Sequence, residues 1–107
     1  MKSNQLLLQD ILGAISAIQS YEVTSYDAFL EDHKTQDAIL YNLIIMGEAA
    51  NKLPSEFQDV HPEIPWSSII GTRNVIVHGY DQVKLQIVWD ILHKNLPSLR
   101  IFLEKII

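Results

Sequence analysis

The stretch KTQDAILYNLIIMGEAANKL, residues 34–53, decides the fold of this chain. Apolar side chains recur in it every three or four residues, as in an amphipathic helix with one buried stripe: Ile39, Leu43, Met46, Ala50 and Leu53. Gly47 and the pair Ala49-Ala50 have small side chains, which allow a second helix to approach closely. Pro54 pushes the residue before it out of the α region. The stretch therefore predicts a long central helix that ends at about Leu53.

Helical spacing or a helix boundary marks the rest of the chain as well. The expected elements are a helix from Asn4 to about Tyr21, a short helix Tyr26–Glu31 capped by Ser25, a short helix Ser55–Val60, a helix from Pro65-Trp66 to His78, and a last helix from about Leu85 onward. Gly79 is a natural terminator, and Pro97 predicts a kink or a break in the last helix. No two segments alternate with period two for long enough to make a sheet. The prediction is an all-α, up-and-down bundle of four main helices plus short helices, in a single domain over residues 1–107.

Length, cysteine content and charge narrow the classes of protein. A chain of 107 residues holds one domain with a modest core. The absence of cysteine excludes disulfides, thiolate metal sites and a cysteine nucleophile, and it fits a reducing cytoplasm. No apolar run approaches the roughly 20 residues that cross a bilayer, and no secretory signal is expected at the N-terminus. A net charge of −5 argues against non-specific binding of long nucleic acid, which needs a basic face.

An arginine, a histidine and a tyrosine, which can hold a phosphate, move a proton and donate a hydrogen bond, fall within eight residues: Arg73-Asn74-Val75-Ile76-Val77-His78-Gly79-Tyr80. At about 100° per residue, Arg73 lies on the same helical stripe as Ile76, an apolar face. A charge on that face needs a carboxylate, a partner subunit or a bound anion, because an unpaired buried charge is costly. His78 lies about 140° round the helix from Arg73. A turn at Gly79 is therefore needed if the loop is to bring Tyr80 back beside both.

These side-chain types suit the cleavage of RNA without a metal ion. The reaction needs a base for the 2′-hydroxyl, an acid for the leaving 5′-oxygen and positive charge near phosphorus. Histidine exchanges protons near neutral pH, arginine offers a charged fork that matches phosphate oxygens, and tyrosine donates a hydrogen bond or stacks on a base. Arg73 and His78 are therefore the candidate catalytic residues, with Tyr80 and Glu48 as candidate supporting residues. The other histidines are scattered without ligand spacing, so neither a metal site nor a cofactor is expected.

The order arginine, four residues, histidine, one residue, tyrosine resembles the motif of the HEPN superfamily of ribonucleases. Blocks that occur in order along the chain resemble the HepT-like toxins of that superfamily: Lys34-Thr35-Gln36-Asp37-Ala38, Gly47-Glu48-Ala49-Ala50-Asn51, Glu63-Ile64-Pro65-Trp66, Ile69-Ile70-Gly71-Thr72-Arg73-Asn74, and Val88-Trp89 followed by Asn95-Leu96-Pro97. The similarity covers nearly the whole chain.

This resemblance implies a metal-independent endoribonuclease that is the toxin of a type II toxin–antitoxin system. It implies an all-α homodimer with two motifs facing one cleft, in which Arg73 and His78 occupy the catalytic positions and Asn74 the position of the family's asparagine. It also implies a minimal nucleotidyltransferase as the antitoxin partner, which would adenylylate Tyr80. A bulky anionic group on that tyrosine would block the place where the RNA phosphate must sit.

Less specific interpretations remain open for each residue. Arg73 could form a structural ion pair with Glu48, or Glu48 could be a solvated helix residue. His78 could interact with the helix dipole, Asn74 could hydrogen-bond locally, and Tyr80 could be a core or interface aromatic. For the whole chain, the alternative is a catalytically weak helical subunit that docks a nucleotidyltransferase.

Overall fold

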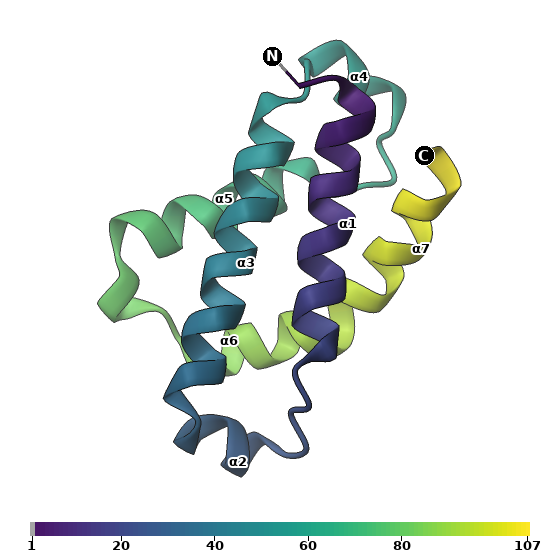
Figure 1. Cartoon of the computed structure of the whole chain (residues 1–107). Helices are drawn as coiled ribbons and strands as arrows, with labels where there is room; N and C mark the ends of the chain where they lie inside the picture. Colours follow the sequence, from purple (N-terminus) through teal and green to yellow (C-terminus); the bar gives the residue numbers. More distant parts are fainter. Residues whose placement is uncertain (1) are drawn as a thin grey trace.

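The computed structural model describes residues 2–107, and the elements in that range are all helical. Two long helices, α1 (Asn4–Ser20) and α3 (His33–Lys52), run antiparallel side by side, and α5 (Trp66–His78) crosses α3 while α7 (Leu96–Ile106) returns beside α1 (Figure 1). The connecting pieces are α2 (Tyr26–Glu31), α4 (Ser55–Val60), a 3₁₀ turn η1 (Tyr80–Gln82), α6 (Leu85–Asp90) and the turn η2 (Ile91–Asn95). The predicted all-α architecture with four main helices is confirmed.

Side-chain caps fix where the first three helices begin. The Ser25 hydroxyl accepts a hydrogen bond from the Ala28 N–H at 3.1 Å, as predicted, and Ser3 caps α1 in the same way through the Leu6 N–H. Asp32 caps α3 by accepting from the Thr35 N–H at 3.1 Å. Such caps satisfy N–H groups that have no partner within the helix. At its other end α3 stops before Pro54, and the residue before that proline has the extended backbone that the proline requires.

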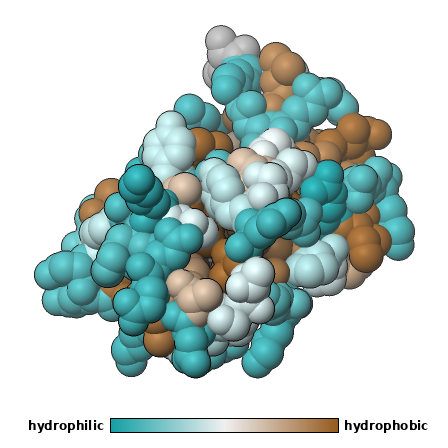
Figure 2. Space-filling model, turned by 60° about the horizontal axis from the view of Figure 1, so that its bottom comes forward, coloured by the Kyte–Doolittle hydropathy of each residue, from teal (hydrophilic) through white to brown (hydrophobic). Residues whose placement is uncertain are grey.

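The core is a single cluster to which all four main helices contribute. Its least exposed large side chains come from α1, α2, α3, α5 and α7: Leu8, Ile11, Ile15, Phe29, Ile39, Ile76, Leu96 and Leu103. The outer surface is mostly polar, with apolar residues in separate patches between hydrophilic ones on the face that Figure 2 shows. No helix within residues 2–107 combines the length and the apolar character needed to span a bilayer.

The interruption expected at Pro97 occurs just before it. Residues Ile91–Asn95 form a π-helical turn, and Pro97 occupies the first turn of α7, where its missing N–H is harmless. A proline at that place cannot donate to the carbonyl four residues earlier, so the hydrogen-bond ladder of the preceding turn is free to widen. The imidazole of His93 stacks on Trp89 with centroids 4.1 Å apart within this wider turn. The predicted interruption is confirmed, and its form is a π turn that separates α6 from α7.

Gly47 sets the spacing between α3 and α5. A methyl group at this position would overlap the Cβ of Arg73 and lie 2.8 Å from its Cγ and 3.1 Å from the backbone oxygen of Ile69. The stem of Arg73 therefore occupies the space that a side chain at position 47 would need. The close helix approach predicted from the small residues is confirmed at Gly47, and an arginine stem fills it.

Gly47→Ala is expected to destabilise the protein, although alanine is the better helix former. The added methyl meets atoms fixed to the α5 backbone, so the helices must separate, and overpacking of this kind costs about 1–3 kcal/mol. The free energy of unfolding in urea measures the change. Gly13→Ala is the matched control, because Gly13 lies in α1 and the added methyl would have no atom within 4 Å beyond its chain neighbours and the backbone of its own helix. It should gain about 0.5–1 kcal/mol. Equal effects of the two substitutions would contradict the role given to Gly47.

Candidate functional site

Arg73 lies at the seam between α3 and α5, with its stem half-buried and its guanidinium at the edge. Its Nη1 donates a hydrogen bond to the Asn74 side-chain oxygen at 2.9 Å, and its Nη2 lies 3.5 Å from a carboxylate oxygen of Glu48 on α3. Its Nε is buried and has no hydrogen-bond partner within the described residues. Of the three kinds of compensation expected for this charge, a carboxylate, a partner subunit or a bound anion, the structure shows a carboxylate, that of Glu48.

The neighbours of Arg73 leave part of its hydrogen-bonding capacity unused. A guanidinium carries five N–H donors, two on each Nη and one on Nε. One donor of Nη1 goes to Asn74 and one of Nη2 points towards Glu48, so each terminal nitrogen keeps a second N–H. Two parallel N–H groups of this kind match two oxygens of a phosphate. The group is thus oriented by the protein and still able to bind an anion.

The Glu48 contact orients the guanidinium more than it stabilises the fold. The Glu48 carboxylate is half exposed, and exposed ion pairs typically contribute about 0–1 kcal/mol. A separation of 3.5 Å also makes this a loose pair. Because the pair is weak, an anionic ligand can compete with Glu48 for the same cation at little cost.

His78 is the last residue of α5, and its side chain is exposed. The Gly79 N–H closes the helix on the Val75 carbonyl at 2.9 Å, and Gly79 keeps a negative φ of −147°, so the helix ends without a left-handed residue. His78 and Arg73 are about 140° apart around the axis and about 7.5 Å apart along it. His78 shares its face of α5 with Val75 and Gly71, three and seven residues before it. That face points away from the seam in which Arg73 lies.

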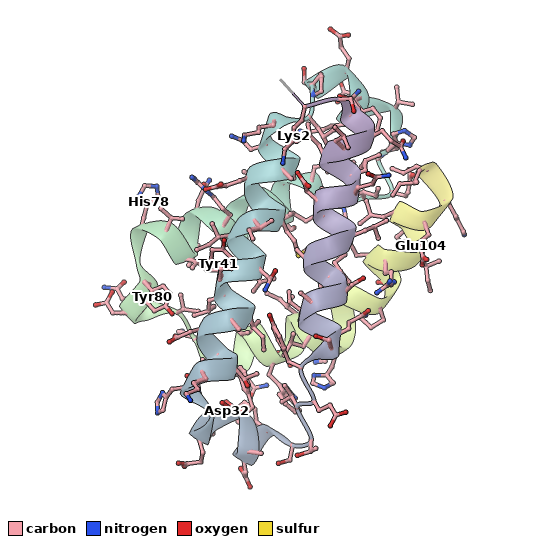
Figure 3. The ribbon with its side chains drawn as sticks, in the orientation of Figure 1. Lys2, Asp32, Tyr41, His78, Tyr80 and Glu104 are labelled. Atoms are coloured by element: carbon pink, nitrogen blue, oxygen red, sulfur yellow. The ribbon has the colours of Figure 1, made fainter. Side chains whose placement is uncertain are left out.

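Tyr80 follows directly after this turn, and its hydroxyl donates a hydrogen bond to the Asp37 carboxylate of α3 at 2.6 Å. His78 and Tyr80 lie on either side of the turn at the end of α5 (Figure 3). The hydrogen bond raises the pKa of Tyr80 above 10.0, and partial burial and the negative charge of Asp37 add to the rise. Tyr80 is therefore held as a neutral phenol whose donor is already used.

Four of the five candidate residues thus lie at two separate points along α3, and His78 lies at neither. Glu48 and Asn74 meet Arg73 at one point of the α3–α5 seam, and Tyr80 meets Asp37 at another. Among residues 2–107, no hydrogen bond or ion pair joins Arg73, His78 and Tyr80 to one another. The expected turn at Gly79 is present, but it delivers the Tyr80 hydroxyl to α3.

Asp37 is the functional candidate that the sequence reasoning missed. It lies eleven residues before Glu48, which is three helical turns, so the two carboxylates share one face of α3. This spacing could have pointed to Asp37. Two acidic residues on one face of a helix can each bind a polar group of a neighbouring helix that carries an arginine. No group of three or more histidine, aspartate and glutamate side chains within the described part of the chain could hold a metal ion.

Comparison with known proteins gives one family. The model described as Ribonuclease HepT-like matches residues 11–106. A protein from Thermococcus cleftensis named Probable ribonuclease HepT is 35% identical over 106 residues, which is 98% of this chain and 96% of that protein. A provisionally named RNase from Methanocaldococcus jannaschii is 33% identical over 91% of this chain and 81% of its own length. A second, from Caldanaerobacter subterraneus subsp. tengcongensis, is 33% identical over 92% of this chain and 89% of its own length. No solved structure gives a significant match.

Asp37→Asn is expected to lower the pKa of Tyr80 towards 10.0, because it removes both the carboxylate acceptor and its charge. Ultraviolet titration of the phenolate signal, taken as the difference between each protein and its Tyr80→Phe counterpart, isolates this tyrosine. An unchanged Tyr80 titration in the variant would show that the hydrogen bond does not form in solution.

The same shift predicts how stability depends on pH. The folded pKa of Tyr80 is raised above the unfolded value, so the contribution to stability is complete below pH 10.0 and is lost as the pH rises through the folded pKa. Unfolding in urea at increasing alkaline pH should therefore show a steeper loss for the wild type than for Asp37→Asn. Asp81→Asn, at an exposed carboxylate next to Tyr80, should behave like the wild type.

Proposed function

This chain belongs to the HepT-like ribonuclease family, and from that membership we propose that it is a metal-independent RNA endonuclease and the toxin of a type II toxin–antitoxin system. The observation that carries the proposal is the state of Arg73. Its stem is seated on Gly47, its guanidinium is oriented by Glu48 and Asn74, and two terminal N–H groups remain unused. A cation held in this way is suited to a phosphate group that arrives from solution.

Arg73 would bind the scissile phosphate, and His78 would move the protons. A base takes the proton of the 2′-hydroxyl, the 2′-oxygen attacks phosphorus, and an acid returns a proton to the leaving 5′-oxygen. Imidazole serves in either role near neutral pH, and the exposed position of His78 leaves it accessible to RNA. The need for a 2′-hydroxyl makes RNA, and not DNA, the substrate.

The active site would be completed by a second copy of the chain. Arg73 lies in the α3–α5 seam, while His78 lies on the outer face of α5. A single chain therefore does not direct both side chains at one phosphate. Next to that outer face is an apolar groove of about 570 Å³ between α5 and α6, and Val75 and Ile87 are exposed along it. A second subunit that covers this face would bring its own Arg73–Tyr80 motif next to the motif of the first subunit.

Tyr80 would be the control point of this site. We expect a nucleotidyltransferase partner, the antitoxin, to attach AMP to the hydroxyl of this tyrosine, a half-exposed residue just after the end of α5. The added group is anionic and bulky, and it would obstruct the approach of RNA past the end of α5 to the site. Repulsion and steric exclusion would then stop cleavage.

Purified wild-type protein is expected to cleave RNA in the presence of EDTA. His78→Ala should lower the cleavage rate by about 10²- to 10⁴-fold, the usual contribution of a general acid or base. Arg73→Lys keeps the stem over Gly47 and a positive charge but loses the fork, and a fall of about 10²-fold is expected. Loss of labelled intact RNA measures both rates.

Matched substitutions elsewhere separate chemistry from general damage. His33→Ala, at an exposed histidine at the start of α3, and Arg100→Lys, at a half-buried arginine on α7, should cleave as the wild type does. If the wild type leaves RNA intact and His78→Ala behaves identically, the endonuclease proposal is wrong. The chain would then act as a docking subunit for its nucleotidyltransferase partner.

A mixing experiment tests the two-subunit site. Arg73→Ala and His78→Ala are each expected to be inactive alone, but a mixed dimer contains one site with an intact arginine from one chain and an intact histidine from the other. Refolding the two together should restore about a quarter of the wild-type activity, since half of the dimers are mixed and each has one good site of two. No recovery, with dimers present by size-exclusion chromatography, would place both residues in one chain's site.

A further inference from the structure

The hydroxyl of Tyr80 meets a carboxylate in an arrangement that cleavage of RNA does not require. The phenol donates to Oδ1 of Asp37 across 43 residues of sequence, at 2.6 Å. Both residues are exposed, so the contact is not a means of burying polar groups in the core. The hydrogen bond places the phenolic proton on the side of Asp37, and Tyr80 as a residue is half exposed.

We propose that Asp37 is the proton acceptor that makes Tyr80 the acceptor of a nucleotidyl group. This inference rests on the proposed function, in which Tyr80 is the modified residue, and it names the group in this chain that assists the transfer. The chain would bring its own base to the reaction, and the partner would supply the activated nucleotide.

The transfer balances as a substitution at phosphorus. The phenolic oxygen of Tyr80 forms a bond to the α-phosphorus of a nucleoside triphosphate, the bond between that phosphorus and the bridging oxygen breaks, and pyrophosphate leaves. The phenolic proton passes to Oδ1 of Asp37 as the new bond forms. An aspartate next to the acceptor hydroxyl performs this task in protein kinases. A distance of 2.6 Å already lies within the reach required of a general base.

If exposure alone decided which of the four tyrosines receives the nucleotidyl group, it would be Tyr41 and not Tyr80. Tyr41 on α3 is 64% exposed against 50% for Tyr80, and its hydroxyl has no hydrogen-bond partner among residues 2–107. Tyr21 accepts from the Asn42 amide at 3.2 Å, and Tyr26 packs on Trp89 with ring centroids 5.5 Å apart. Of the four, Tyr80 is the tyrosine whose hydroxyl donates to a carboxylate. Tyr41, labelled on the same view in Figure 3, is therefore a control within the protein itself.

The test uses a small activated nucleotide, adenosine 5′-phosphorimidazolide, with the full-length protein and no partner. Attack by a phenol forms the tyrosine–AMP bond, breaks the phosphorus–nitrogen bond and releases imidazole. Peptide mass spectrometry over time gives separate labelling rates for Tyr80 and Tyr41. General base assistance predicts that Tyr80 is labelled on the order of 10- to 100-fold faster than Tyr41. Asp37→Asn should then bring Tyr80 down to the rate of Tyr41.

The opposite result has a clear physical meaning. If the hydrogen bond only stabilises the neutral phenol, Tyr80 will be labelled more slowly than Tyr41, and Asp37→Asn will accelerate it. Either a slow wild-type Tyr80 or an unslowed Asp37→Asn protein overturns the proposal. Asp81→Asn, which removes an exposed charge next to Tyr80 without touching its hydroxyl, should leave the Tyr80 rate unchanged. The ratio of Tyr80 to Tyr41 in the wild type decides the question even if a variant folds poorly.

Failure of the proposed function would look different. Protein labelled at Tyr80 by the reagent would then cleave RNA as fast as unlabelled protein, whatever the labelling rates had been. Rapid labelling that depends on Asp37, without any effect on RNA cleavage, would support the proton-acceptor role and remove the regulatory one.

Discussion

The structure depends on the absence of a side chain at Gly47. Because this residue has no Cβ, α5 can approach α3 until the stem of Arg73 fills the gap. Hydrophobic burial by Ile69 and Ile76 holds the two helices together on either side of that contact. Arginine is rarely placed in such a seam, because its charge must stay solvated or paired. Here the apolar stem packs and the guanidinium reaches the edge, which reconciles a buried position with a charged group.

Electrostatics in this chain are local. The net charge is −5, and the surface offers no general attraction for a polyanion. The α3–α5 seam holds one cation, the Arg73 guanidinium, which Glu48 and Asn74 orient. The helix that carries it, α5, ends at His78. Two acidic residues of α3, Asp37 and Glu48, each engage one group carried by or following α5. The long helix thus acts as a common support that sets the distance between the cation and the phenol.

Local signals made most of the fold predictable from the sequence, and long-range contacts set the limit. Proline, glycine and capping residues act within a few positions, so the bounds of α2, α4 and α5 agree with those expected from the chain alone. The cost of burying a charge predicted that Arg73 needs a partner, and Glu48 was one of the candidates left open for it. The Asp37 contact did not follow, because 43 residues separate it from Tyr80 and the direction of the turn after Gly79 depends on how α5 meets α3. The π turn before Pro97 was hidden for a related reason. A proline predicts a disturbed ladder, but the form of the disturbance depends on neighbours such as the stacked pair Trp89 and His93.

One consequence of the Gly47 seat concerns how the chain can change over time. The Cβ and Cγ of Arg73 set the distance between α3 and α5, and the same side chain carries the guanidinium. The position of the guanidinium therefore depends directly on the separation of the two helices. A core substitution that pushes the helices apart by a fraction of an ångström displaces the guanidinium by a similar amount, even if the substituted residue lies far from the surface. The packing of α3 on α5 and the position of the Arg73 guanidinium are therefore coupled in this protein. Neither can drift without the other, so the interior of α3 and α5 should tolerate fewer substitutions than burial alone would suggest.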